Sequence, residues 1–391
     1  MTTKNGRLAL ILTTGFAMFS MFFGSGNLVF PIQVGMQSDG HTWFASLGIL
    51  LTGVLVPLLG SLVILLYRGE NHNFFATMGK SATFWLPLVA LSLMGPFGVA
   101  ARCITVAHGS FVHLYAATPL WLFSLLMCAI IFLSTRKQSK VLSLLGTYLT
   151  PLLLVSMSLI IIFGLWFGLP VVAAGQGEFH AVANGLLQGY QTMDLIAAFF
   201  FSTFVIHHLP DSLLQDGGNR NLVKTFLAAA TIGMSLLALI YVGMTYLGAS
   251  YSNLLQGVAP EQLLGSIAFH AMGASASIVV CIAVVLACFT TAVVLVSLFA
   301  EFLQVEISKN KLSEKWAMII SLLITFLIST LEFSGIAAFL KPILDAVYPA
   351  LIVLTAMGIS HKLWKTKIYR SVVVATFLVT LACQIYGFVA N

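Results

Sequence analysis

The sequence predicts an all-α, polytopic membrane protein, and two observations carry this prediction. First, 59% of the 391 residues are hydrophobic and only 8% are charged, with a mean hydropathy of +1.02, whereas a soluble domain carries about 25% charged residues. Second, the apolar residues form long runs and not the ten-residue alternating segments of an outer-membrane barrel. The composition excludes a soluble enzyme, a nucleic-acid-binding protein and a disordered scaffold.

The long apolar runs define the predicted spans, because a helix needs about 20 apolar residues to cross a bilayer. We expect eleven transmembrane helices on this basis. Their ranges are 8–35, 42–67, 84–112, 119–134, 141–168, 190–208, 222–248, 275–303, 316–331, 343–360 and 369–389.

The basic residues predict how the chain is threaded, because cytoplasmic loops carry an excess of Lys and Arg. With the N-terminus placed inside, 16 of the 18 basic residues fall in inside loops, while Lys341 falls outside and Arg102 lies within a span. The odd number of spans then places the C-terminus outside. The residues assigned to the inside are Lys4, Arg7, Arg68, Lys80, Arg136, Lys137, Lys140, Arg220, Lys224, Lys309, Lys311, Lys315, Lys362, Lys365, Lys367 and Arg370.

The order of the spans is typical of an inverted repeat of five plus five helices. Spans 1 and 6 each contain an interruption, spans 3 and 8 are long, and spans 4 and 9 are short. Inverted repeats whose first helices are broken are a signature of secondary transporters, which bind substrate at the breaks. We therefore expect a single transmembrane domain over residues 1–391, with repeats at about 8–168 and 190–360 and an accessory helix at 369–389.

The interruption in span 1 is the strongest local signal in the chain. Gly24-Ser25-Gly26-Asn27 lies in the middle of an apolar run that reaches Pro31. A glycine destabilises a helix interior by about 1 kcal/mol relative to alanine, and free backbone groups are tolerated at membrane depth only where they line a cavity. The alternative is a helix-packing patch of small residues, although these glycines are two residues apart and not four as in GxxxG.

Span 6 contains the second predicted break. Thr192-Met193-Asp194 opens this span, and Phe201-Ser202 lies near its middle. Asp194 is costly near a bilayer unless it is paired or hydrated, which favours a functional role. The alternative is an interfacial carboxylate that the dipole of the helix N-terminus stabilises.

Three further spans carry polar groups that indicate either function or packing. Thr290 and Thr291 in span 8 offer hydroxyl ligands for a cation, or they bond to the preceding turn of their own helix. Arg102 in span 3 is expected to face a polar interior. Asp345 in span 10 is a candidate gate charge or a member of a structural ion pair.

Four motifs in a fixed order resemble one known family. That family is the branched-chain amino acid:cation symporters, the BrnQ-type bacterial carrier II proteins, whose members are similar to LeuT-type inverted-repeat transporters and import leucine, isoleucine and valine with sodium. The likeness extends from about span 1 to span 10. The motifs are Gly24-Ser25-Gly26-Asn27-Leu28-Val29-Phe30-Pro31, Gly95-Pro96-Phe97 followed by Arg102, Gly189-Tyr190 before Thr192-Met193-Asp194, and Thr290-Thr291 before Ala300-Glu301-Phe302.

The resemblance implies sodium-driven import of a neutral aliphatic amino acid by alternating access, in the bacterial cytoplasmic membrane and without any cofactor besides the coupling ion. It implies no nucleic-acid partner, and it leaves the oligomeric state open. Arg102, Asp194 and Asp345 are candidate gate or coupling charges. The implied substrate groups are Gly24, Ser25, Gly26 and Asn27 for the carboxylate and the carbonyls of Phe199, Phe201 and Ser202 for the ammonium. The implied sodium ligands are the carbonyls of Ser20, Phe23 and Ala287 and the hydroxyls of Thr290 and Thr291.

The chain departs from the family pattern at three points. Ser202 stands where relatives usually have glycine, His108 replaces an expected acidic residue, and eleven spans are predicted where relatives have twelve. A drift of substrate preference, for instance to methionine, is compatible with these changes. Proton coupling through Asp194, His108 or Arg102 is the alternative within the same fold. A membrane-embedded enzyme or a channel is disfavoured, because we find neither a catalytic motif nor a filter-like repeated loop.

Overall fold

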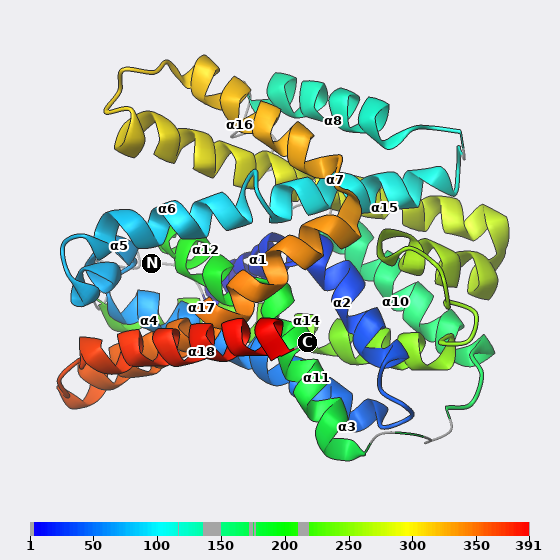
Figure 1. Cartoon of the computed structure of the whole chain (residues 1–391), viewed down its shortest axis with the longest axis horizontal. Coiled ribbons are helices and arrows are strands. Elements are labelled where there is room, and N and C mark those ends of the chain that lie inside the picture. The colour runs from blue at the N-terminus through cyan, green and yellow to red at the C-terminus, as the bar shows by residue number, and fades with distance from the viewer. Residues whose placement is uncertain are drawn as a thin grey trace.

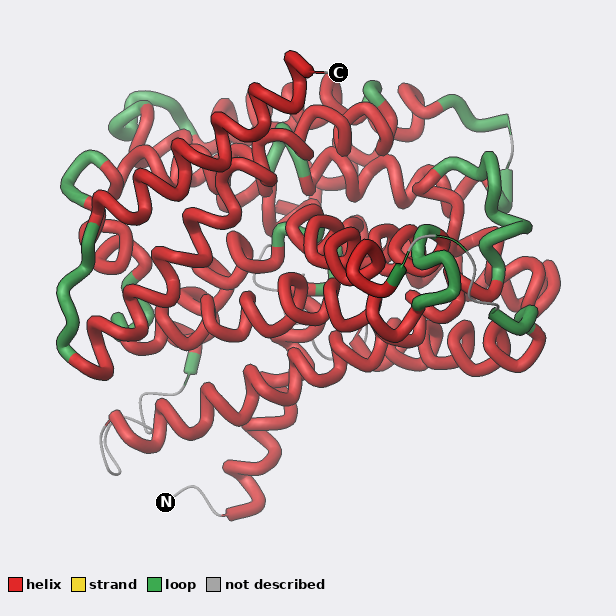
Figure 2. The backbone as a smooth tube through the Cα atoms, turned by 60° about the horizontal axis from the view of Figure 1, so that its bottom comes forward, coloured by secondary structure: helices red, strands yellow, loops and turns green. Residues whose placement is uncertain are grey.

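The computed structural model describes residues 4–115, 117–135, 150–171, 175, 177–209 and 219–390. Figures 1 and 2 show that the regular structure in this part of the chain is helical, with no strand among the described residues. The predicted all-α class is therefore confirmed. Residues 141–149 of predicted span 5, and the basic residues Arg136, Lys137 and Lys140, lie outside the described residues.

The helices follow one another in the order of the predicted spans. Short π-helical turns at Leu51–Leu55 and Leu303–Ile307 lie within or at the end of long helices, and Pro260–Gln262 forms a 3₁₀ turn. The α-helices are α1 (Lys4–Phe22), α2 (Ser25–Met36), α3 (Thr42–Leu50), α4 (Val56–Leu66), α5 (Asn71–Phe75), α6 (Ala82–Met94), α7 (Val99–Val112), α8 (Leu120–Thr135), α10 (Thr150–Phe167), α11 (Glu178–Gln191), α12 (Asp194–His208), α14 (Asn219–Ser250), α15 (Leu263–Phe302), α16 (Glu314–Ser329), α17 (Glu332–Trp364) and α18 (Arg370–Ala390).

Six helical segments of the described chain are each long and apolar enough to cross a membrane. The number rises to eight if each of two bent helix pairs counts as one span. The bent pairs are α1 with α2, at 72°, and α11 with α12, at 43°. α8 and residues 370–386 of α18 form shorter apolar helices. The chain is thus a multi-pass membrane protein, and its two sharp breaks fall in the two spans for which the sequence predicts an interruption.

Two predicted spans differ from the observed helices. Span 6 begins at Glu178 and not at residue 190, because the polar, amphipathic helix α11 precedes the break. Span 3 is divided into α6 and α7, which end and begin on either side of Gly95-Pro96-Phe97-Gly98. Proline lacks the N–H that would continue the helix, and the flanking glycines tolerate the irregular backbone.

Loops assigned to the same side of the membrane lie together. On the predicted inner side, Arg370 at the start of α18 donates from Nε to the carbonyl oxygen of Thr77 at 2.8 Å. On the predicted outer side, Asn184 of α11 donates to Oε1 of Gln37, just after α2, at 3.1 Å. The span boundaries are therefore consistent with one another in three dimensions.

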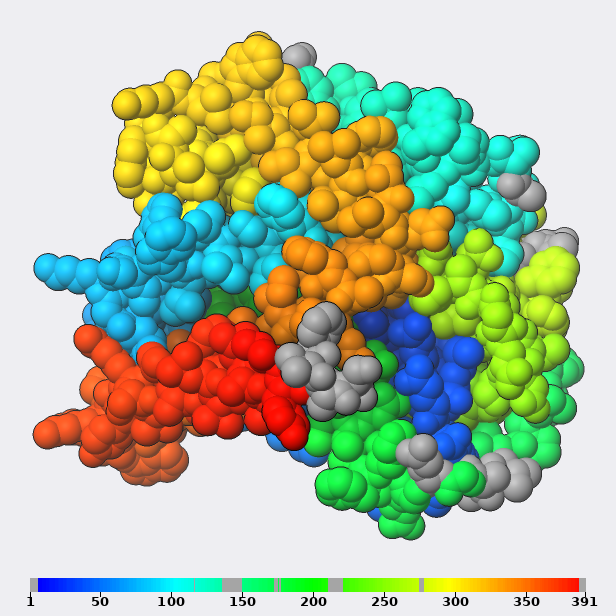
Figure 3. All heavy atoms as spheres, viewed as in Figure 1, coloured from blue at the N-terminus to red at the C-terminus, as the bar shows by residue number. Residues whose placement is uncertain are grey.

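Close helix packing anchors both broken spans. A Cβ added to Gly248 of α14 would lie 2.0 Å from the carbonyl oxygen of Ile32 in α2, and one added to Gly185 of α11 would lie 2.3 Å from that of Ala45 in α3. Such small-residue contacts let helix backbones approach in a membrane. On the face that Figure 3 shows, α17 and α18 (orange and red) lie beside segments of α6, α11 and α15, and part of the N-terminal region (blue) reaches the surface beside α17.

Candidate functional site

The two helix breaks touch each other in the interior of the bundle. A Cβ added to Gly26 of α2 would lie 3.2 Å from Cα of Thr192 and 3.4 Å from the carbonyl oxygen of Gln191. Met193, the residue before α12, has a left-handed backbone with φ of 63°, a conformation that costs free energy for a residue other than glycine. Opened backbone from α1–α2 and from α11–α12 therefore meets at one place.

The break between α1 and α2 is stabilised by a side chain. Gly24 has an extended backbone, and its N–H donates to Oδ1 of Asn27 at 3.1 Å. In a continuous helix this N–H would bond to the carbonyl of Ser20, which therefore loses that partner. The predicted interruption of span 1 is confirmed, and it frees a carbonyl of α1 as well as the first N–H groups of α2.

The break in span 6 lies at Thr192-Met193-Asp194, the first of the two motifs named for this span, and not at Phe201-Ser202. Phe199, Phe201 and Ser202 are in the interior of α12, where their carbonyls accept the backbone hydrogen bonds of a continuous helix, and that of Phe199 also accepts from Thr203 at 3.0 Å. The ring of Phe199 packs against Phe74 of α5. The buried hydroxyl of Ser202 has no hydrogen-bond partner among the described residues.

Asp194, at the start of α12, is the centre of a buried polar cluster. Its Oδ2 accepts a hydrogen bond from Nδ2 of Asn27 at 2.8 Å and one from the hydroxyl of Tyr241 at 2.9 Å. Nδ2 of Asn27 also contacts the Tyr241 oxygen. The cluster joins α2, α12 and α14, and no cation is paired with this carboxylate among the described residues. Tyr241 is a site residue that sequence reasoning missed.

Arg102 of α7 reaches the same region from another side. Nη1 donates to the carbonyl oxygen of Gln191 at 2.9 Å, and Nη2 donates to Oε1 of Gln191 at 3.1 Å. The guanidinium carbon lies 5.2 Å from the ring centroid of Phe30 and 5.4 Å from that of Phe333. The predicted inward orientation of Arg102 is confirmed, and its observed partner is the end of α11.

The two threonines of α15 have different surroundings. The hydroxyl of Thr290 donates to the carbonyl of Ala287 at 2.8 Å, which is the local bonding that the alternative interpretation described. The methyl group of Thr291 lies next to the first break, because a Cβ on Gly24 would lie 3.4 Å from its Cγ2. α15 is thus in contact with α1–α2 at the position where a cation site was expected.

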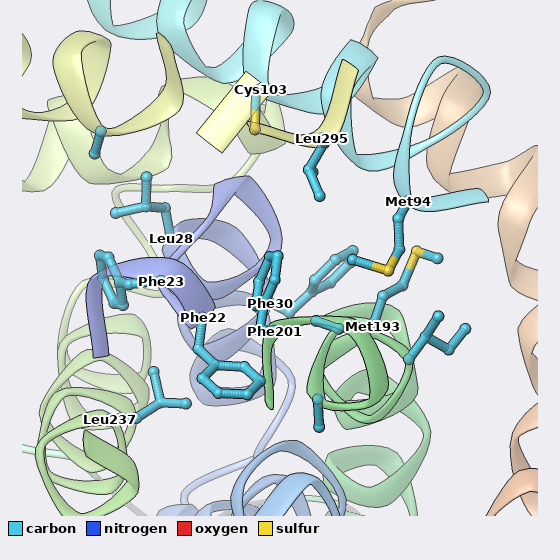
Figure 4. Packing of buried hydrophobic residues seen from close by; sticks show 14 of the residues in the cluster. Phe22, Phe23, Leu28, Phe30, Met94, Cys103, Met193, Phe201, Leu237 and Leu295 are labelled. Carbon is cyan, nitrogen blue, oxygen red and sulfur yellow. The ribbon is translucent and has the colours of Figure 1, made fainter. Parts of the chain in front are cut away.

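Apolar side chains surround the breaks. Leu28 of α2, Cys103 of α7 and Leu295 of α15 are all buried in the same hydrophobic cluster, and Figure 4 shows them beside Phe30. The Cys103 thiol also hydrogen-bonds with Ser25. An aliphatic ligand held at the breaks would be in contact with side chains from several helices.

Other predicted polar residues lie away from this cluster. Asp345 is partly buried near Lys341 and Tyr190, and its Oδ1 has no hydrogen-bond partner in the described part of the chain. Nε2 of His108, in α7, is bonded to the carbonyl of Thr118, in the loop that follows this helix, at 2.8 Å. The described residues contain no group of three or more metal-ligating side chains.

The fold is shared with solved membrane transporters. Mhp1, a nucleobase-cation-symport-1 family transporter in a closed conformation, matches with a TM-score of 0.64 and 15% identity over 91% of this chain and 78% of its own. A point mutant of the Eremococcus coleocola manganese transporter matches with a TM-score of 0.60 and 13% identity over 100% of this chain and 90% of its own. These two likenesses show the fold that the chain shares with both proteins.

The sequence comparisons identify the family. Residues 8–390 match the family described as branched-chain amino acid transport proteins, and the chain belongs to this family. The branched-chain amino acid transport system 2 carrier protein of Pseudomonas aeruginosa is 27% identical over 90% of this chain and 81% of its own length. The BrnQ permease of Corynebacterium glutamicum is 30% identical over the same shares.

The family membership confirms the resemblance that the four motifs carried. The matched proteins are carriers and permeases, so the chain is a transport protein and not an enzyme.

Proposed function

We propose that this protein imports leucine, isoleucine, valine or a related neutral aliphatic amino acid, methionine included, by sodium symport with alternating access. The observation that carries the proposal is the contact between the two helix breaks, at which Gly26 lies against Thr192. Opened backbone in a membrane interior provides N–H groups for a carboxylate and carbonyls for cations without a charged side chain. The names of the curated relatives support the choice of substrate.

The proposed sodium site lies where α15 meets the first break. The carbonyl of Ser20 has lost its helical partner, the carbonyl of Phe23 precedes the N-cap of α2, and Thr291 is in contact with Gly24. The carbonyl of Ala287 and the hydroxyl of Thr290 complete the proposed oxygen ligands, of which a hard cation needs several.

The finer architecture is part of the same proposal. Residues 1–391 form one transmembrane domain of eleven spans, in which an inverted repeat of 8–168 and 190–360 precedes an accessory helix. The N-terminus is cytoplasmic, the C-terminus is outside, and the protein lies in the cytoplasmic membrane of a bacterium. Asp345 is a gate charge of span 10, because its partly buried carboxylate has an oxygen without a partner in the described chain.

One observation favours proton coupling as a second candidate. Asp194 is buried, accepts hydrogen bonds from neutral side chains such as Asn27 and Tyr241, and pairs with no cation among the described residues. A carboxylate in this position is the kind of group that carries a proton in membrane transporters. Sodium coupling remains the first candidate, because the first break frees the carbonyl of Ser20 and Thr291 of α15 contacts Gly24 at that break.

Binding to the purified protein tests the proposed function. A panel of leucine, isoleucine, valine, methionine, glycine and glutamate is titrated in sodium chloride and again in potassium chloride. We expect the aliphatic members alone to bind, and to bind at least about tenfold more tightly in sodium, which corresponds to about 1.4 kcal/mol of coupling. Equal affinity in the two salts at constant pH contradicts sodium coupling, and absence of binding by every aliphatic member contradicts the choice of substrate.

A further inference from the structure

Two buried side chains of opposite charge lie on either side of the break between α11 and α12. Arg102 is bonded to Gln191, the last residue of α11, and Asp194 is the first residue of α12. Both are almost completely shielded, with exposed fractions of 0% and 2%. Neither belongs to an ion pair between described residues. A buried charge without a counter-charge is costly, which indicates that a partner arrives during function.

The Arg102 side offers unused donors. Nε of Arg102 and Nε2 of Gln191 are buried and have no hydrogen-bond partner among the described residues. Buried donors of this kind are rarely left unpaired in a protein. The two nitrogens belong to side chains that are bonded to each other, and Gly26 at the N-terminus of α2 lies against Gln191. A carboxylate matches this arrangement, because it accepts several charge-assisted hydrogen bonds at once.

The Asp194 side offers an uncompensated negative charge. Its side-chain partners, Asn27, Tyr241 and Thr192, are neutral donors that orient the carboxylate but do not cancel its charge. An ammonium group provides both a positive charge and N–H donors, and a carboxylate accepts more than two hydrogen bonds. The ammonium and the carboxylate of an amino acid would therefore each lie near a side chain of opposite charge beside the same break.

We propose that Arg102 with Gln191 binds the α-carboxylate of the transported amino acid, and that Asp194 binds its α-ammonium. This inference rests on the proposed function and makes it specific: the site selects α-amino acids by their zwitterionic end, and the hydrophobic cluster around Leu28 and Leu295 accepts the side chain. A substrate bound to both charged residues would link α7, which carries Arg102, to α12, which carries Asp194. It would also be linked to α2, because Asn27 of that helix is bonded to Asp194. The carbonyls of α12 that were first expected to hold the ammonium are then not needed for it.

A ligand series with the wild-type protein tests the inference without any substitution. Leucine is compared with leucinamide, which lacks the carboxylate, and with 4-methylpentanoate, which lacks the ammonium. We expect leucine to bind at least about 100-fold more tightly than either analogue, because each analogue leaves one buried charge unpaired. Affinities within threefold of that of leucine would overturn the inference while leaving the proposed function in place.

Two variants, each of which removes one side-chain charge, test which group of the substrate each residue binds. In Asp194→Asn, we expect the affinity for leucine to fall by about 100-fold or more, to the level of 4-methylpentanoate, and that for 4-methylpentanoate to stay the same, so that the preference is lost. In Arg102→Gln, the preference of leucine over leucinamide is lost in the same way. Lys311→Gln and Glu314→Gln, at exposed loop and helix-start positions, are matched controls. Arg102→Lys keeps the charge and is used if Arg102→Gln does not fold.

The outcomes separate the inference from the proposed function. A parallel loss of leucine and 4-methylpentanoate binding in Asp194→Asn indicates a purely structural role and overturns the assignment of the ammonium. If Arg102→Gln still prefers leucine to leucinamide, the assignment of Arg102 to the substrate carboxylate is overturned. If the wild-type protein binds no aliphatic amino acid, the proposed function fails and the inference fails with it.

Discussion

The hydroxyl of Tyr241 donates a 2.9 Å hydrogen bond to Oδ2 of Asp194, the same oxygen that accepts from Asn27. Because Tyr241 is in the middle of α14, this bond connects a continuous helix to both broken spans. A phenol buried in a membrane interior is stable only with such a partner. The orientation of the Asp194 carboxylate therefore depends on α14, a helix that the sequence motifs do not include.

Replacement of Tyr241 by phenylalanine should impair transport without unfolding the protein. The change removes one of the hydrogen bonds to a buried carboxylate, a loss of about 1–3 kcal/mol or about 5- to 150-fold in affinity. Leucine binding to purified protein measures the effect. Tyr246→Phe, on the same helix but without a hydroxyl hydrogen bond among the described residues, is the control and should behave as wild type.

Substitution of Thr291 by alanine should weaken the dependence on sodium and leave amino acid selectivity intact. We expect the sodium concentration for half-maximal leucine uptake to rise by about tenfold, because one oxygen ligand of the proposed ion site is lost. Thr291→Ser keeps the hydroxyl and should stay close to wild type. A change in the leucine-to-valine ratio in place of the sodium shift would argue against a direct ligand role.

A bulky residue at Gly26 should abolish transport. A Cβ there meets Thr192 at 3.2 Å, so Gly26→Val forces the two breaks apart. Uptake normalised to the amount of protein in the membrane measures the effect. Gly177→Val, where an added Cβ meets nothing within 4 Å, is the control. Normal uptake by Gly26→Val would show that the contact between the breaks is not required.

Phe199 should matter for stability and not for substrate affinity. Its ring is buried against Phe74 and Phe75, and truncation of such a ring costs about 3–5 kcal/mol through lost packing. Phe199→Ala should lower the unfolding temperature of the solubilised protein, whereas the folded fraction should bind leucine normally. A normal unfolding temperature combined with lost affinity would restore the substrate role expected from sequence.

Glu261, outside the spans, should make stability depend on pH. Burial, together with nearby Glu332, raises the pKa of the Glu261 carboxyl above its ordinary value of 4.5. The folded state then binds more protons than the unfolded state above pH 4.5, so stability falls as the pH rises through the raised pKa. Thermal unfolding should show that Glu261→Gln stabilises the protein at pH 7 and flattens this dependence. The exposed Glu314→Gln should do neither.

The first break was predictable because its signal is local. Gly24 and Gly26 interrupt an apolar run, and each disfavours a helix by itself. The second break has no such signal, because the residue that leaves the helical conformation is Met193, a good helix former. Its left-handed backbone lies between α11 and α12, and Phe201-Ser202, the other motif named for this span, lies inside the continuous helix.

The partners of the charged residues could not be predicted, because they depend on how distant helices pack together. Asp194 and Arg102 are conspicuous in an apolar sequence, so both were chosen as candidates. Tyr241 and Gln191 are ordinary in sequence, and they become partners only because α14 and α11 place them there. Helix α11 itself was missed, because its polar face gives it the composition of a loop.

Leucine uptake into proteoliposomes tests the central claim most directly. The purified protein is reconstituted with potassium inside, and an inward sodium gradient is compared with a potassium-only control at constant pH and with a protonophore present. The account predicts transient accumulation of leucine above its equilibrium level in sodium alone, with no effect of the protonophore. Uptake that ignores the sodium gradient and collapses with the protonophore would contradict sodium symport and select the proton-coupled alternative.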